Sequence, residues 1–292
     1  MSNLALIANA LVSGLLLAGF YAAVSVGVAI SFGMLEVVNI AHPAFIVLGS
    51  YAAWLAQARL GIDPIAAGVL LCPAFFVLGL GLYRLYHASF ERHGRESLRG
   101  LAFFFGILLV TEVGLILAFG VDYRLGAARY VDVTWRLGFV DLPLRLLLPF
   151  VASLAMTLSL QAYLSRTFFG RTVLAVGQDP LALQLMGVDP VRVKQAAFGI
   201  SIATAGLAGA LLLVIQPVQP SLGRDYIGLV FAVTVLGGMG SIPGTLAGAA
   251  VLGIAESFTS TFFGPSWAPA VSFGLLLVAL AARPSGLLGR SG

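Results

Sequence analysis

Asn39 and His42 stand out in this sequence because they are polar side chains placed between two long apolar runs. They are three residues apart, so they would share one face of a helix. As a pair they have the donors and acceptors to hydrogen-bond a polar solute that crosses the membrane. The competing use of such side chains is to satisfy backbone groups that a helix break leaves free. The spacing leaves both uses open.

Two carboxylates, Glu112 and Glu256, fall inside apolar runs. A charged side chain at the bilayer centre costs about 2.5 to 3.5 kcal/mol on insertion scales, so we expect each to be neutral, paired or beside water. Glu112 could face a solute pathway, or a neighbouring hydroxyl such as that of Thr111 could hold it. Tyr21 and Ser25, in the first apolar run, join the pathway candidates because they are polar enough to face protein rather than lipid.

A charged island at residues 166–194 separates two other apolar runs. Its charged residues are Arg166, Arg171, Asp179, Asp189, Arg192 and Lys194. The excess of cations predicts that the island lies on the cytoplasmic side.

The centre of this island has the pattern of a short helix near residues 179–187. Asp179 can cap its start, Gly187 can end it, and Leu183 and Met186 belong to an apolar stripe. Such a helix either docks in a groove of a soluble partner or lies on the lipid headgroups, and the pattern alone allows both.

The composition predicts an all-α polytopic membrane protein. Of 292 residues, 60% are hydrophobic and 10% are charged, and the mean hydropathy is +1.02. The net charge of +4 comes from cations between the apolar runs, so it reports orientation rather than nucleic-acid binding. The single cysteine, Cys72, excludes a disulfide framework within the chain.

The apolar runs predict about eight or nine transmembrane helices in one transmembrane domain over residues 1–292. The runs are 4–32, 44–58, 65–86, 100–120, 146–164, 195–215, 226–236, 245–263 and 268–282. The number depends on whether GGMGSIPG, at 237–244, is a turn or part of a continuous span. The polar side chains and the proline near 36–43 predict a broken or re-entrant segment.

The segments between the runs indicate the orientation. The loop 87–99 holds Arg92, His93 and Arg95, and we expect it to be cytoplasmic. Residues 121–145 have nearly balanced charge and interfacial aromatic residues, so we place them on the periplasmic side, with RYVDVTWRL as a short strand. Arg283 and Arg290 place the C-terminus in the cytoplasm.

Small residues at regular spacing predict close helix packing. Ser201, Ala205 and Gly209 are four residues apart. The late segment carries two overlapping GxxxG steps. Its candidate packing residues are Gly237, Gly238, Gly240, Gly244, Gly248 and Glu256.

Four segments, in order, resemble one family of membrane proteins. They are VVNIAHPAFIVLGSY at 37–51, GRTVLAVGQDPLALQLMGVD at 170–189, VLGGMGSIPGTLAGAAVLGIAES at 235–257 and RPSGLLG at 283–289. Together they are similar to the LivH-type permease subunits of branched-chain amino-acid ABC importers. Two positions depart from the family pattern: Pro43 stands where a glycine is expected after the histidine, and Glu112 where a glutamine is expected.

The resemblance implies a multi-pass subunit of the bacterial inner membrane with several partners. These are a second, LivM-like permease subunit, two cytoplasmic ABC ATPase subunits and a periplasmic substrate-binding protein. The segment 166–194 would be the coupling segment to the ATPases, with Arg171, Asp179, Leu183, Met186 and Gly187 as contacts. No P-loop occurs in the sequence, so ATP and Mg²⁺ would be used by the partners, and this chain would be neither an enzyme nor a cofactor carrier.

The sequence leaves other transport functions open. Related permeases carry urea or short amides, and the partner permease could be a second copy of this chain. A gradient-driven secondary transporter would use Glu112 or Glu256 as a proton-coupled carboxylate. A passive channel would need no ATPase. The coupling segment argues against the secondary transporter and against the channel.

Overall fold

The computed structural model describes residues 3–91, 97–138, 140–283 and 286–289, and it is almost entirely helical. The α-helices are α1 (Asn3–Ser31), α2 (His42–Leu60), α3 (Pro64–Ser89), α4 (Ser97–Phe119), α5 (Leu144–Arg166), α6 (Phe168–Val176), α7 (Pro180–Leu185), α8 (Pro190–Ile215), α9 (Leu222–Gly237), α10 (Ile242–Phe262) and α11 (Ala268–Ala282). Strands β1 (Thr134–Leu137) and β2 (Val140–Pro143) form one hairpin, and a short 3-10 helix, Pro265–Trp267, precedes α11. The expectations for Arg92, His93, Arg95 and Arg290 fall outside the described residues.

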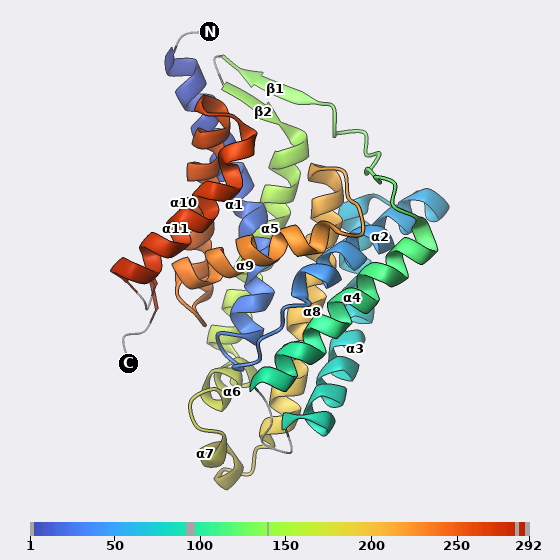
Figure 1. Ribbon diagram of the computed structural model, residues 1–292, viewed down its shortest axis with the longest axis vertical. Coiled ribbons are helices and arrows are strands. Elements are labelled where there is room, and N and C mark those ends of the chain that lie inside the picture. The colour runs from blue at the N-terminus through green and yellow to red at the C-terminus, as the bar shows by residue number, and fades with distance from the viewer. Residues whose placement is uncertain (1–2, 92–96, 139, 284–285, 290–292) are drawn as a thin grey trace.

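The all-α polytopic membrane fold is confirmed. Six described helices, α1, α3, α4, α5, α8 and α10, are long and apolar enough to cross a membrane. The other apolar helices are shorter, with 19 residues in α2, 16 in α9 and 15 in α11. These three account for the difference from the expected eight or nine spans. Figure 1 shows α9 lying across the middle of the molecule rather than along its length.

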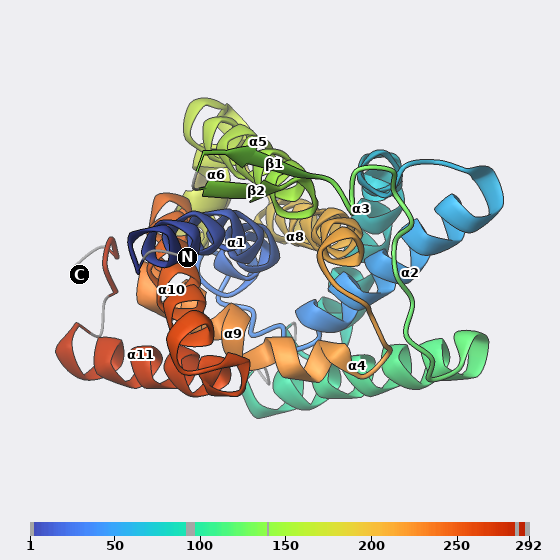
Figure 2. The same ribbon diagram turned by 90° about the horizontal axis from the view of Figure 1, so that it is seen from above.

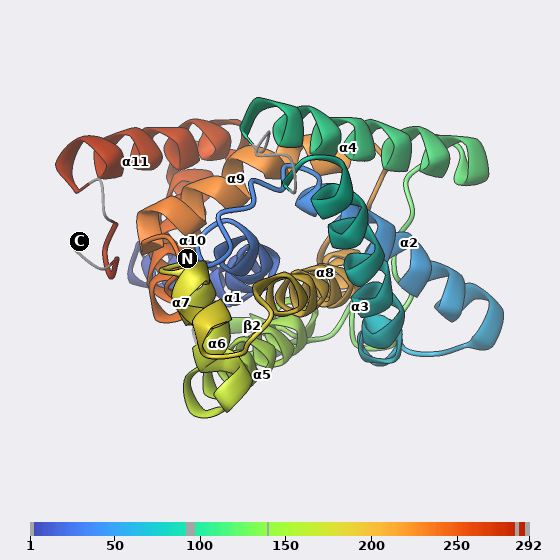
Figure 3. The ribbon, with the colours of Figure 1, turned by 90° about the horizontal axis from the view of Figure 1, so that it is seen from below.

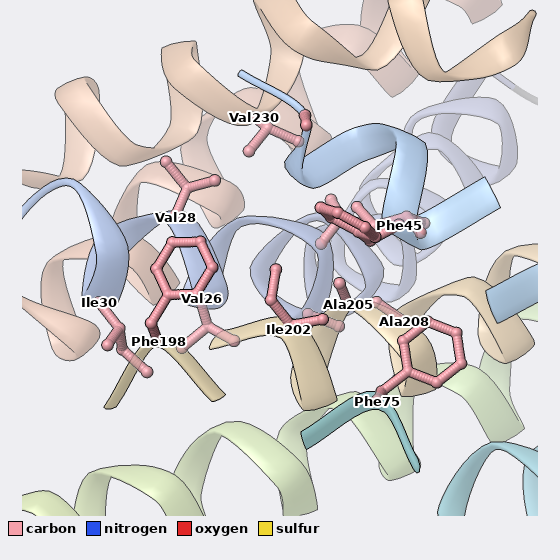
Figure 4. Packing of buried hydrophobic residues seen from close by; sticks show 14 of the residues in the cluster. Val26, Val28, Ile30, Phe45, Phe75, Phe198, Ile202, Ala205, Ala208 and Val230 are labelled. Atoms are coloured by element: carbon pink, nitrogen blue, oxygen red, sulfur yellow. The ribbon is translucent and has the colours of Figure 1, made fainter. Parts of the chain in front are cut away.

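Helices α8 and α1 form the centre of the fold. In α8, 83% of the most apolar window is buried inside the protein, against 22% in α3 and 17% in α5. Figure 4 shows Phe198, Ile202 and Ala205 of α8 next to Val26 of α1 and Phe45 of α2. The outer helices therefore turn most of their apolar surface outward, as expected for helices that face lipid or another subunit.

Glycines allow the central helices to touch backbone to backbone. A Cβ atom at Gly209 in α8 would overlap the carbonyl oxygen of Ile46 in α2. Beside this contact, the Ser50 hydroxyl donates a hydrogen bond to the Gly209 carbonyl over 2.6 Å. The Ser201 hydroxyl donates to the Gly27 carbonyl of α1 over 2.7 Å. The predicted packing face of α8 is thus present in the structure.

The late glycine-rich segment forms a turn between α9 and α10. Gly244 in α10 lies against Gly237 at the end of α9, and Gly248 lies against the Val233 carbonyl. The expectation for Gly240 is wrong in one respect. Gly240 precedes α10, so it does not lie on the helical GxxxG face; it has φ +78° in the turn and packs against Gly33. Only glycine readily adopts that conformation at so close a contact.

The hairpin and the charged island lie at opposite ends of the molecule. Figure 1 places β1 and β2 beside the start of α1, and α6 and α7 at the far end, which Figure 3 shows from below. The strand predicted in RYVDVTWRL is confirmed in part, as β1 pairs antiparallel with β2. Arg124 and Val218 exchange backbone hydrogen bonds of 2.8 Å, so the segments after α4 and after α8 meet. This geometry agrees with placing 121–145 and 166–194 on opposite sides of a membrane.

Candidate functional site

The chain breaks between α1 and α2 as the sequence predicts, and the irregular segment is largely buried. Residues 32–41 are not helical, and Leu35, Val37, Asn39 and Ala41 have at most 3% of their surface exposed. The Asn39 side-chain oxygen accepts a hydrogen bond of 3.1 Å from the Ala41 amide. The side-chain oxygen of Asn39 therefore bonds to a backbone N–H group at the helix break, which is the competing use considered above. Pro43 lies in the first turn of α2, where a missing N–H costs no helical hydrogen bond.

His42 is fully buried where α1, α2 and α8 meet. A Cβ atom at Gly27 of α1 would overlap the His42 ring, and would also meet the Ser201 carbonyl and the Thr204 hydroxyl of α8. The Val24 carbonyl is near the ring, but neither imidazole nitrogen has a partner at hydrogen-bonding geometry among the described residues. The Ser25 hydroxyl, also fully buried, likewise has none. A pathway role for these side chains requires the helices to separate.

Glu112 is paired, but with a residue that the sequence pattern did not single out. Its Oε1 atom accepts a hydrogen bond of 2.8 Å from Nη2 of Arg224, in the first turn of α9. The Thr111 hydroxyl donates instead to the Ile107 carbonyl within α4. In this ion pair, the side chain of Glu112 is 10% exposed and the side chain of Arg224 is 56% exposed. Arg224 lies two residues before the apolar run 226–236, and this position is the sequence signal that could have identified it.

Glu256 is hydrogen-bonded to Tyr21, which joins two residues that the sequence placed in different groups. The Tyr21 hydroxyl of α1 donates to Glu256 Oε2 of α10 over 2.6 Å. Close by, the Ser257 hydroxyl donates to the Ala10 carbonyl, and Gly14 packs against Ile254. In the structure, Tyr21 and Glu256 therefore both belong to the α1–α10 contact. The pathway role of Tyr21 stays a prediction.

The predicted cytoplasmic helix is present as α7. Asp179 accepts a hydrogen bond of 2.9 Å from the Ala182 amide and caps the helix. Gly187 follows it with φ +80°, the left-handed conformation that ends helices. Arg171 lies on the preceding helix α6 and is exposed. The local pattern of the charged island was thus sufficient to predict this helix and its ends.

The predicted outward face of α7 needs a correction. Leu183 is only 4% exposed and belongs to the core of this chain, so it does not contact a partner. The exposed apolar side chains are Leu181 (65%), Leu185 (83%) and Met186 (70%). Leu181 and Leu185 are one helical turn apart, whereas Leu183 lies on the opposite side of the helix. Helical periodicity could have identified Leu185, but not which face turns inward.

A cluster centred on Glu91 links the end of α3 to the start of α8, where the charged island ends. The Glu91 carboxylate accepts hydrogen bonds from Lys194 Nζ over 2.7 Å and from the Tyr83 hydroxyl over 2.6 Å. His87 Nδ1 lies 2.9 Å from it. Burial raises the pKa of the Glu91 carboxyl, but the hydrogen bonds from Lys194, Tyr83 and His87 outweigh it and lower the pKa overall. No sequence signal pointed to this cluster, because Glu91 and Lys194 are far apart in the chain.

We predict that Lys194→Met destabilises the protein at neutral pH and much less at low pH. Because the folded pKa of Glu91 lies below its ordinary value of 4.5, the stabilisation is present above that value and is lost as the pH falls through the folded pKa. The expected loss at pH 7 is about 1 to 3 kcal/mol, as for hydrogen bonds to charged groups. Thermal unfolding of the purified protein in detergent, with wild type and variant compared at both pH values, measures it. An equal difference at both pH values would contradict the assignment.

A cavity lies beside α6, away from the side chains predicted to line a pathway. It has a volume of about 400 Å³ and lies between the segment after α1, the end of α5 and the α9–α10 turn. Its polar lining includes Glu36, Gln161, Ser165, Gln178 and Ser241. Tyr21, Ser25, Asn39, His42 and Glu112 do not line it. In the described part of the chain, the structure therefore does not bring the predicted pathway residues together in one cavity.

Comparisons with known proteins identify the family. The family described as "Branched-chain amino acid transport system / permease component" matches residues 10–280. The high-affinity branched-chain amino acid transport system permease protein BraD of Pseudomonas aeruginosa is 28% identical over 291 residues, covering 96% of this chain and 95% of the relative. The corresponding LivH protein of Escherichia coli K12 is 29% identical over 294 residues, covering 95% and 94%.

A shorter match links the chain to a second kind of branched-chain amino acid transport permease. The permease protein LivM of Salmonella typhimurium is 35% identical over 142 residues, which cover 47% of this chain and 33% of that relative. No solved structure matches the chain significantly. Because the family match spans nearly the whole sequence and the fold is a multi-pass bundle of apolar helices, the chain belongs to the family of permease components of branched-chain amino acid transport systems.

Proposed function

We propose that this permease carries branched-chain or other hydrophobic amino acids across the bacterial inner membrane as one of two permease subunits in an ATP-driven importer. The cargo is supported by the names of the relatives that match along nearly the whole chain. The match to LivM supports a second permease subunit of related sequence. Two cytoplasmic ATPase subunits and a periplasmic binding protein complete the proposed complex.

The observation that carries the ATP-driven mechanism is the exposed apolar surface of α7. Leu181, Leu185 and Met186 are exposed on or directly after α7, which lies at the end of the molecule opposite the hairpin. Apolar side chains on a short helix outside the lipid are stable when a groove on a partner covers them. We assign that groove to the ATPase, with Arg171 and the other cations of 166–194 at its rim.

The proposed cycle is alternating access driven from the cytoplasm. Closure of the two ATPases on ATP moves α7, and this movement is transmitted to α5 and α8 on either side of the segment 166–194. ATP and Mg²⁺ act in the partner subunits, and this chain holds no cofactor. In this arrangement the hairpin faces the periplasm, and the C-terminus, which follows α11, is cytoplasmic.

Uptake by the reconstituted complex tests this function. The chain is co-expressed with its partner permease and ATPases and placed in proteoliposomes, and the binding protein is added outside. We expect uptake of radiolabelled leucine that requires ATP inside and the loaded binding protein outside. Uptake of urea in place of leucine would contradict the proposed cargo. Uptake by this chain alone, driven by a proton gradient, would contradict the ATP-driven mechanism.

A further inference from the structure

Two opposite charges follow one another in the first turn of α9, directly before its apolar residues. Arg224 and Asp225 occupy the first turn of this helix, and both are exposed. Arg224 is paired with Glu112 of α4 through a hydrogen bond of 2.8 Å. A guanidinium has five N–H donors, so with respect to the described residues most of those of Arg224 stay available to another group.

The position of Glu112 places this group of charges within the membrane. Glu112 is 7 residues before the end of α4, counted from 112 to 119. At 1.5 Å per residue, this is about 10 Å along the axis from that end of a helix long and apolar enough to cross a membrane. The contact made by the residue before Arg224 agrees with this position. Gly223 lies against Pro43 and Ala44 at the start of α2, just after the buried break. Figure 1 also shows α9 crossing the middle of the molecule.

Exposed charges at this depth do not face lipid. Arg and Asp in the hydrocarbon region of a membrane are costly when no water or partner meets them, by about 2.5 to 3.5 kcal/mol or more at the bilayer centre. Arg224 and Asp225 therefore border a water-accessible space or another polar group. Figures 2 and 3 show α9 with α4 and α11 along one edge of the molecule, on the side away from α5. A second permease subunit at this edge would supply the polar groups or the water that these charges need.

The local charges suit a ligand that is itself a zwitterion. Glu112, Arg224 and Asp225 sum to one negative charge. The starts of α2 and α9 converge here, and each contributes about half a positive charge through its helix dipole. The sum is close to zero, with opposite signs separated in space. A carboxylate fits the fork of a guanidinium, and an ammonium group fits a carboxylate.

We propose that Arg224 binds the carboxylate and Asp225 the ammonium group of an amino-acid cargo within the membrane, with Glu112 holding the guanidinium in place. This inference rests on the proposed function and adds the part of the cargo that the membrane subunit recognises. A neutral solute such as urea has no charged groups that could pair with Arg224 and Asp225. The starts of α2 and α9 meet at this site, and helix N-termini that converge in this way suit the anionic group of a cargo.

A charge swap separates recognition from structure. Arg224→Gln is expected to lower leucine uptake per ATP hydrolysed at least about tenfold, as for the loss of a hydrogen bond to a charged group. Asp225→Asn is expected to do the same. The double variant Glu112→Arg with Arg224→Glu restores an ion pair between α4 and α9, so it should recover the thermal stability of the complex. It presents a carboxylate where the cargo needs a cation, so uptake should stay low.

The controls make each outcome decisive. Arg59→Gln removes an exposed arginine from the last turn of α2 and should transport as wild type. If the swapped complex does not assemble, Arg224→Lys decides, because lysine keeps the charge but loses the fork. Reduced uptake at unchanged thermal stability supports the site, and unchanged uptake overturns it. Full uptake by an assembled swap variant also overturns it. A wild-type complex that fails to take up leucine contradicts the proposed function itself.

Discussion

Replacing Leu185 and Met186 together with aspartate should abolish ATP-dependent uptake and release the ATPases from the permease. These side chains are 83% and 70% exposed on α7. Burying two such groups against a partner is worth about 3 kcal/mol or more, and buried aspartates add a desolvation penalty. Binding of the ATPases should therefore weaken at least about a hundredfold. Co-purification of tagged permease with the ATPases, followed by the uptake assay, measures both effects.

Two further variants show whether the effect belongs to α7. Leu125→Asp makes the same change on an exposed side chain at the opposite end of the molecule, and it should keep the ATPases bound. Leu183→Asp should instead reduce the yield of folded protein, because Leu183 is buried in this chain. Normal uptake by the Leu185 and Met186 variant, with the ATPases still bound, would show that α7 is not the docking helix.

Gly209→Val should destabilise the folded permease by about 3 kcal/mol, the upper part of the usual range for overpacking. The position admits no Cβ atom, since one would overlap the Ile46 carbonyl, and the Ser50 hydroxyl bonds to the Gly209 carbonyl at the same contact. Helix α2 must move away from α8 to make room. We expect a lower unfolding temperature in detergent and a smaller monodisperse peak on size-exclusion chromatography.

Gly81→Val is the matched control for this prediction. Gly81 also lies within a helix, α3, but a Cβ atom there would meet nothing within 4 Å. This variant should unfold at the temperature of the wild type or slightly above it, because glycine is a poor helix former. Equal effects of the two substitutions would mean that the α2–α8 contact is looser than the structure shows.

Several features could be predicted because they depend on neighbours in the sequence. Asp179 and Gly187 mark the ends of α7, since caps act within one turn of the helix. The break before α2 follows from a proline and polar side chains between apolar runs. The four-residue spacing of Ser201, Ala205 and Gly209 predicts the packing face of α8, because residues four apart lie on one side of a helix.

Other features depend on which helices meet, and the sequence does not contain that information locally. Glu112 lies 112 residues from Arg224, and Tyr21 lies 235 residues from Glu256. Gly240 belongs to a spaced series of glycines, yet α10 begins after it. Leu183 and Leu185 are equally apolar, and only packing against the rest of the chain decides which one is buried.

The sequence by itself determined that this chain is a helical membrane permease with a capped short helix in its charged segment and a break before α2. The length of an apolar run and the capping residues of a helix act on neighbouring residues. The order of the family motifs is likewise visible in the sequence, so all three can be recognised without the structure. The tertiary structure alone decided the partners of the buried charges, the outward face of α7 and the meeting of the starts of α2 and α9. The physical reason is that close contacts at Gly209, Gly27 and Gly14 fix how the helices cross. Those crossings set which distant polar groups come within hydrogen-bonding distance.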